Sequence, residues 1–223
     1  MINMARQREA FIFDLNGTMI DDMAYHVKAW HTILQALGAD LSYEKVKEEC
    51  YGKNHELLER VFPNRFSPEE KDRMSLEKEK GYQLAFRPHL KLIAGLQEVL
   101  EWAKTQGIPM AIGSAAIRFN IDFVLDGLQI RDYFDAIVSA DDVVKSKPDP
   151  ETFLKSAALL GTEPATCIVF EDAPKGVEAA ENAGMRSLVL TTMHPEADFT
   201  AYRNIIGFAK DYNDPAIGGL MMK

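Results

Sequence analysis

Short apolar runs recur along the chain and have the length of buried strands. They cover residues 10–14, 109–113, 136–140, 167–171 and 186–191. Between the later runs, apolar residues repeat at helical spacing in 95–107, 150–161 and 174–184. Continuous apolar runs are typical of strands in a parallel sheet, which helices then connect. The pattern therefore predicts an α/β fold with a doubly wound parallel sheet.

The segment from about residue 20 to 90 breaks this alternation. It contains no convincing strand and four amphipathic helical stretches, of which 22–37 is the first. In residues 69–80, nine of twelve residues are charged. We therefore expect an all-α insertion on two short connectors, near 17–21 and 87–93, that acts as a lid above the strand ends.

Composition limits the class of protein. The 223 residues are 47% hydrophobic and 26% charged, as in an ordinary soluble protein with room for a core and a small second domain. A net charge of −9 argues against non-specific nucleic-acid binding. There is neither a signal-peptide pattern nor an apolar run of 18 residues. We expect a cytoplasmic monomer without a membrane partner, in which Cys50 and Cys167 are reduced and buried.

Asp14 ends the first apolar run, in FIFDLNGT, and a polar turn follows it. The carboxyl end of a buried strand is where open α/β sheets place their chemistry. A carboxylate at that place can bind a metal ion, act as a nucleophile, or do both. It can also be ordinary turn chemistry.

Three further features follow later strands in order: Ser114 in AIGSAA, Lys147 in SKPDP, and the pair Glu171–Asp172 in VFEDAPKG. Taken singly, Ser114 and the acidic pair could cap helices, and Lys147 could be a solvated loop charge. Taken together with Asp14, they favour phosphoryl transfer, which depends on positioning and on neutralising negative charge. Asp14 and the acidic pair would then hold Mg²⁺, a cation that prefers oxygen ligands.

These motifs resemble those of the haloacid dehalogenase superfamily, through DLNGT, GSAA, SKPDPETF and VFEDAPKGVEAAENAGM. Within it, the chain is most similar to the β-phosphoglucomutase-like branch of phosphatases and sugar-phosphate mutases. The segment AYHVKAW places His26 at that branch's cap-hinge histidine, and KEKGY places Lys78 at its cap lysine. The resemblance implies a Rossmann-like core of residues 1–19 and 90–223 with a helical cap of residues 20–89.

The resemblance also implies a small phosphorylated metabolite, such as a sugar phosphate, as substrate. Asp14 would attack phosphorus and become an aspartyl-phosphate. The implied Mg²⁺ ligands are Asp14, the main-chain carbonyl of Asn16, Asp172, and Glu171 directly or through water. The implied substrate-binding residues are Ser114 with Ala115, Lys147, and, in the closed state of the cap, His26 and Lys78. From the residues alone, His26 is instead expected to be a buried core histidine and Lys78 a solvated charge.

Asn16 departs from the family pattern, which has an aspartate there as general acid and base. An amide cannot exchange a proton in this way, and such catalysis is worth about 10²–10⁴-fold. Three explanations stay open: an introduced substitution, a natural enzyme for good leaving groups, or a weak or non-catalytic relative.

Other departures tell against a mutase. His55 stands where the mutase pattern has an arginine, and the polar residues after Ser114 are replaced by Ala116 and Ile117, although Arg118 and Asn120 could substitute. We therefore predict a Mg²⁺-dependent phosphatase. The alternatives are a β-phosphoglucomutase-type isomerase and a ligand-binding relative.

Overall fold

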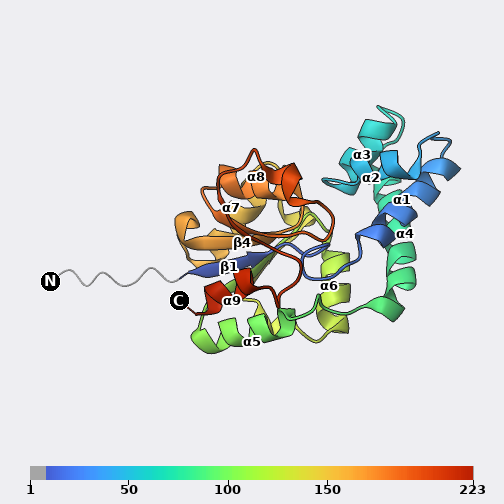
Figure 1. Ribbon diagram of the computed structural model, residues 1–223. Helices are drawn as coiled ribbons and strands as arrows, with labels where there is room; N and C mark the ends of the chain where they lie inside the picture. Colours follow the sequence, from blue (N-terminus) through green and yellow to red (C-terminus); the bar gives the residue numbers. More distant parts are fainter. Residues whose placement is uncertain (1–8, 223) are drawn as a thin grey trace. The chain divides into compact units, whose positions relative to one another are not determined.

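The computed structural model describes residues 9–222, and its core is a six-stranded sheet (Figure 1). The strand order is β3-β2-β1-β4-β5-β6, and every neighbouring pair is parallel. The strands are β1 (Ala10–Phe13), β2 (Met110–Gly113), β3 (Ala136–Val138), β4 (Cys167–Glu171), β5 (Arg186–Leu190) and β6 (Ile205–Ala209). The predicted doubly wound α/β fold is therefore confirmed, with β1 in the interior of the sheet.

Two details of the strand prediction were wrong. The run 136–140 ends as a strand at Val138, because Ser139 caps a 3₁₀ turn, η3 (Ala140–Asp142), and its hydroxyl accepts from the amide of Asp141. The edge strand β6 was missed. Its residues are mostly half-exposed and include Gly207, so it lacks the continuous apolar run of a buried strand.

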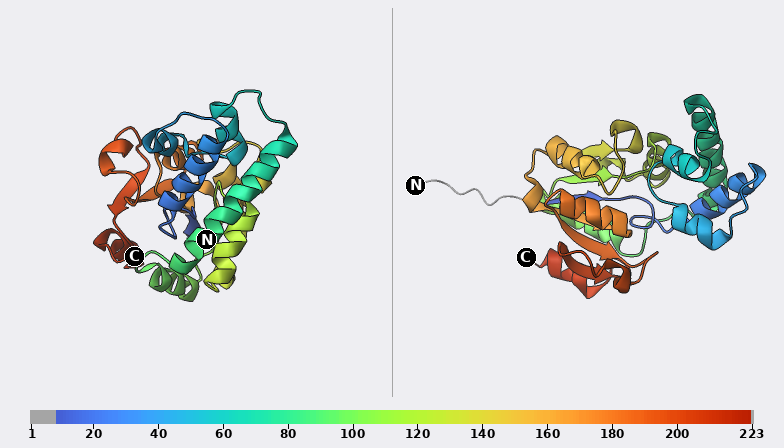
Figure 2. Two further views of the ribbon diagram at one scale, coloured as in Figure 1. Left: turned by 90° about the vertical axis from the view of Figure 1, so that its right-hand side faces the viewer. Right: turned by 90° about the horizontal axis from the view of Figure 1, so that it is seen from above.

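Helices cover both faces of the sheet (Figures 1 and 2). On one side lie α7 (Glu151–Leu160) and α8 (Pro174–Asn182), and on the other lie α5 (Leu96–Gln106) and α9 (Pro215–Met221). The remaining elements of this part are α6 (Arg118–Gly127), η2 (Arg131–Tyr133), η4 (Pro164–Thr166) and η5 (Glu196–Phe199). The predicted helix ends at Gly107 and Gly161 are confirmed, since both glycines adopt left-handed C-cap conformations.

The core has two chemically different layers. Ala10 and Ile12 pack with the side chains of α7 and α8 in a cluster that is aliphatic apart from Phe153 and Cys167 among its larger members. Phe11 and Phe13 point to the opposite face, where Phe13 and Phe170 stack with ring centroids 4.4 Å apart. All four residues of β1 are buried, which explains its uninterrupted apolar sequence.

The chain divides into two compact units, which we describe separately. One contains the described residues up to Asp21 and from Lys91 onward, and the other is Asp22–Leu90. The second unit contains the predicted helical insertion: α1 (Met23–Ala36), α2 (Tyr43–Glu49), α3 (Asn54–Val61), α4 (Pro68–Phe86) and η1 (Arg87–His89). It has its own apolar cluster around Val27, Trp30 and Leu34. In α4, Ser67 and Glu70 form a capping box before the charged stretch.

Two expectations based on composition can be compared with the fold. Both cysteines are free, but only Cys167 is buried; Cys50 ends α2 and is half-buried, so the prediction that it is buried was wrong. Within residues 9–222, no helix combines the length and the apolar character needed to cross a membrane.

Candidate functional site

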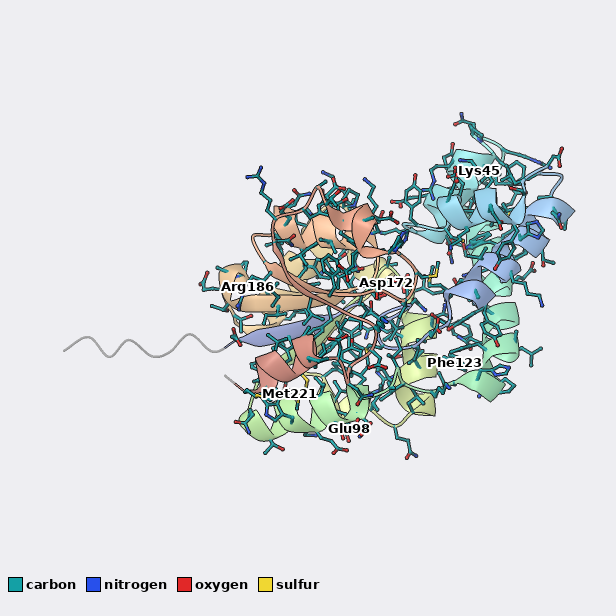
Figure 3. The ribbon with its side chains drawn as sticks, in the orientation of Figure 1. Lys45, Glu98, Phe123, Asp172, Arg186 and Met221 are labelled. Carbon is teal, nitrogen blue, oxygen red and sulfur yellow. The ribbon has the colours of Figure 1, made fainter. Side chains whose placement is uncertain are left out.

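The candidate site lies at the carboxyl ends of the central strands. Figure 3 shows Asp172, directly after β4, at the opposite end of the sheet from Arg186, where β5 begins. The amide of Asp14 donates to the carbonyl of Phe170, and the amide of Ser114 donates to that of Val138. These bonds continue the strand ladders past their ends and bring Asp14, Ser114 and the acidic pair to one edge.

Lys147 reaches this edge from the loop before α7. Its ammonium donates to Asp14 Oδ1 at 2.6 Å and to Glu171 Oε1 at 2.7 Å. All three side chains are buried. Burial lowers the pKa of Lys147, but the charges of Asp14 and Glu171 raise it by more than burial lowers it. The pKa of Lys147 therefore lies above its ordinary value. Lys147 is thus a buried cation beside Asp14, and the alternative that it is a solvated loop charge is excluded.

Both carboxylate oxygens of Glu171 accept hydrogen bonds. Its second oxygen, Oε2, accepts from the amides of Asp172 and Ala173 at 2.9 and 3.0 Å. A Cβ on Gly176 would lie 1.8 Å from Glu171 Oε1, so α8 can approach this carboxylate only with glycine at that position. The arrangement fixes Glu171 as the partner that orients Lys147.

The buried side chains of the site include more acidic than basic groups. Burial and the neighbouring Glu171 raise the pKa of Asp14 to about 6, although Lys147 and a hydrogen bond with Ser114 lower it. Burial and repulsion from Glu171 and Asp14 raise the pKa of Asp172 well above its usual range. Three buried carboxylates thus face one ammonium. Such a cluster is unfavourable unless a further cation neutralises it.

The donor set fits Mg²⁺. Across residues 9–222, no three histidine, cysteine, aspartate or glutamate side chains converge as a metal-binding group. At this edge Asp14 and Asp172 could supply carboxylate oxygens, whereas both oxygens of Glu171 already accept hydrogen bonds from Lys147 and two amides. Main-chain oxygen and water could complete the shell. Mg²⁺ is commonly bound through one or two carboxylates and keeps several waters.

The turn after Asp14 lies directly against Asp172. Gly17 has φ +75°, and a Cβ there would lie 2.1 Å from Asp172 Oδ2, so this close approach requires glycine. The hydroxyl of Thr18 donates to Asp172 Oδ1 at 3.3 Å. Asn16 is half-buried in the same turn and forms a β-bridge with Ile20. Thr18 was not predicted as a site residue, although its place in the polar turn NGT was a signal.

The loop after β2 holds the remaining predicted residues of this unit. Ser114 is buried, and its Oγ accepts from the amide of Ala116 at 3.2 Å across Ala115. Arg118 begins α6, where its guanidinium lies 3.6 Å from Asp142 and donates to the carbonyl of Ile137. Asn120 is buried in the first turn of α6. Ser114 is thus brought to Asp14, whereas Arg118 is paired with η3.

His26 and Lys78 meet inside the helical unit. The Lys78 ammonium lies 2.6 Å from His26 Nδ1 and 3.0 Å from Glu79 Oε1, and His26 Nε2 lies 3.2 Å from Asp22 Oδ2. Because an ammonium can only donate, Nδ1 accepts and the ring proton is on Nε2, facing Asp22. The ring of Tyr82 stacks on His26 at 3.8 Å, and its hydroxyl also donates to Asp22.

This pair changes two expectations. His26 is buried, as the apolar face of its helix predicted, but its partners are polar. Lys78 is only 3% exposed, so the solvated charge that its residues alone suggested is wrong, and its role in substrate binding stays a prediction. A continuous charge run hides which of its members faces inward. His55, in contrast, is half-exposed and lies 2.8 Å from Asp72.

Comparison with known proteins gives consistent results. The family model described as haloacid dehalogenase-like hydrolase matches residues 11–190. The chain is 31% identical to hexitol phosphatase B from Escherichia coli over 211 residues, covering 86% of each protein. It is 33% identical to β-phosphoglucomutase from Bacillus subtilis over 186 residues, covering 79% of this chain and 80% of that protein. The crystal structure of β-phosphoglucomutase from Clostridium difficile superposes with a TM-score of 0.81 at 28% identity, covering 97% of this chain and 100% of that one.

Proposed function

Because the chain belongs to the haloacid dehalogenase-like hydrolase family, we propose that it is a Mg²⁺-dependent phosphatase acting on a small phosphorylated metabolite, such as a sugar phosphate. The observation that carries this proposal is the buried cluster in which Lys147 bridges Asp14 and Glu171 beside Asp172. The similarity to hexitol phosphatase B supports a phosphorylated sugar or polyol as substrate.

The chemistry begins at Asp14. One carboxylate oxygen attacks phosphorus, the bond from phosphorus to the leaving oxygen breaks, and an aspartyl-phosphate forms. Water then attacks the same phosphorus and the bond between phosphorus and the Asp14 oxygen breaks. Inorganic phosphate leaves with the protons of that water, and the carboxylate of Asp14 is restored. Mg²⁺, held by Asp14, Asp172 and the main-chain carbonyl of Asn16, would supply positive charge to the transferring phosphoryl oxygens.

Lys147 and Ser114 would hold the phosphoryl group. The ammonium of Lys147 lies 2.6 Å from the nucleophile, so it neutralises negative charge where the phosphoryl oxygens must approach. The Ser114 hydroxyl and the amides after it would donate to these oxygens. Glu171 would keep Lys147 in place. Asn16 cannot donate a proton, so the leaving oxygen must take one from water or leave as a stable anion.

The test is phosphate release from a panel of small phosphoesters and acyl phosphates with MgCl₂ present. Asp14→Asn preserves the shape of the side chain and removes the nucleophile, so we expect turnover to be lost. The matched control is Asp122→Asn, which alters a half-buried carboxylate on α6 that pairs with Arg131, away from Asp14 in the sequence. Full activity in Asp14→Asn would refute the mechanism.

Two alternatives have a specific observation behind them. The buried His26–Lys78 pair, with the similarity to β-phosphoglucomutase, favours a mutase. That enzyme would form glucose 6-phosphate from β-glucose 1-phosphate, faster with a bisphosphate primer, and net phosphate release without isomerisation would exclude it. Asn16 favours a weak, ligand-binding relative, which would bind phosphorylated ligands without turnover.

A further inference from the structure

Two hydroxyl groups from the C-terminal part of the core hold the turn that follows Asp14. Thr192 Oγ1 donates to the carbonyl of Gly17 at 2.5 Å. Tyr212 Oη donates to the carbonyl of Thr18 at 3.1 Å. Consecutive carbonyls of one turn are thus bound by donors that lie more than 170 positions away in the chain.

Tyr212 is itself held firmly. It is only 3% exposed, and its ring lies 5.9 Å from Phe170 and 6.5 Å from Phe13, the stacked pair that precedes Glu171 and Asp14. Its amide donates to the carbonyl of Ala94 at 2.9 Å. These contacts hold the phenol ring in place, with its hydroxyl directed at the carbonyl of Thr18.

The anchored turn is the one that contacts Asp172. The Thr18 hydroxyl donates to Asp172, and Gly17 packs directly against the same carboxylate. The turn also has internal bonds, such as Gly17 N–H to the Ile20 carbonyl at 2.8 Å, which set its shape. Internal bonds cannot set where the turn stands relative to β4. The ladder bond from Asp14 to Phe170 and the bond from Thr18 to Asp172 tie the turn to β4 at its start and at the carboxylate. The bonds from Thr192 and Tyr212 add a constraint from the other side, because they come from the segments after β5 and β6.

We propose that Thr192 and Tyr212 are positioning residues of the cation site: they fix the turn so that the Asn16 carbonyl and the Thr18-bound Asp172 carboxylate stand ready for Mg²⁺. This inference rests on the proposed function, since it concerns the metal of that site. Both residues lie beyond residue 190, where the match to the family model ends. Groups that orient metal ligands affect affinity without touching the metal.

The experiment measures MgCl₂ binding to the full-length chain by isothermal titration calorimetry, without substrate. Tyr212→Phe and Thr192→Val each remove one hydroxyl and keep the packing. We expect each to weaken Mg²⁺ binding about tenfold, the lower end for groups that orient metal ligands. Phosphate release at saturating MgCl₂ should stay close to wild type, because the ligands themselves are unchanged.

Matched controls separate positioning from general stability. Tyr202→Phe removes a phenolic hydroxyl from a half-buried tyrosine packed on the cluster around Val177 and Phe199. Thr191→Val removes a neighbouring hydroxyl that donates to the carbonyl of Ala209 instead of to the turn. Both should bind Mg²⁺ as the wild type does. In hydrogen exchange, the amides of Gly17, Met19 and Ile20 should exchange faster in the two test variants than in the controls.

The outcomes distinguish the inference from the proposed function. A wild type that binds Mg²⁺ and releases phosphate, with Mg²⁺ affinity unchanged in Tyr212→Phe and Thr192→Val, overturns the inference and leaves the function standing. Equal weakening in the controls also overturns it, because the effect would then be one of stability. A wild type that neither binds Mg²⁺ nor releases phosphate refutes the function, and the inference falls with it.

Discussion

Gly176 gives the sharpest test of how the site is built. It lies in the first turn of α8, and a Cβ there would lie 1.8 Å from Glu171 Oε1 and 1.9 Å from its carboxyl carbon. Gly176→Ala therefore forces the carboxylate out of its place. Glu171 then loses the amides of Asp172 and Ala173, and Lys147 loses one of its two carboxylate partners.

The magnitude follows from two opposing effects. Breaking a buried ion pair typically costs about 3–5 kcal/mol. Replacing glycine by alanine inside a helix returns about 1 kcal/mol. The free energy of unfolding should therefore fall by about 2–4 kcal/mol, which for a chain of this size lowers Tm by roughly 4–16 °C. Phosphate release should fall as well, because Lys147 is no longer held beside Asp14.

Gly81→Ala is the matched control. Gly81 lies within α4, and a Cβ there would meet no atom within 4 Å. The same substitution should raise the free energy of unfolding by about 0.5–1 kcal/mol through helix propensity alone. Thermal melts and phosphate-release assays of both variants decide the matter. If Gly176→Ala has the same Tm as Gly81→Ala and stays fully active, Glu171 does not hold Lys147 beside Asp14.

Two further changes test other parts of the molecule. Asn16→Asp introduces a proton donor in the turn, so turnover of alkyl phosphates should rise by about 10²–10⁴-fold in a phosphate-release assay if the site is otherwise competent. No rise would favour a binding role or a chemistry without an acid. Although Cys50 is only half-buried, its packing against the apolar cluster of the helical unit removes water from the thiol and raises its pKa to about 11, while the nearby Lys78 lowers it. Since only the thiolate reacts, alkylation of Cys50 followed by mass spectrometry should speed up about tenfold for each pH unit between pH 7 and 10, and a plateau below pH 9 would contradict that pKa.

Most strands of the central sheet could be predicted from the sequence, for a physical reason. Strands such as 167–171 are buried on both faces, so nearly every position is apolar and the run is conspicuous. The half-exposed β6 has no such constraint and was missed. Asp14 and Lys147 were identifiable because each follows a recognisable strand in a distinctive motif.

The partners of these residues were harder to predict. Tyr212 and Thr192 act through main-chain carbonyls, which any residue possesses, so no pattern in the 15–20 turn indicates them. Lys78 stands in a run where most side chains carry charge, and only the fold shows that it faces His26. Side chains that bind other side chains across the fold leave no local signature.

The position of β1 in the sheet has a consequence for how the molecule assembles during translation. Its partners are far away in the chain: Phe11 pairs with Met110, and Ile12 with Val169. The stretch Asp22–Leu90, in contrast, contains an apolar cluster formed from its own helices. During translation, the helical segment can therefore fold early. The first strand cannot pair with β4 until about 150 more residues have been synthesised. Contacts of such long loop length are slow to form, so closure of the sheet around β1 should be the late step.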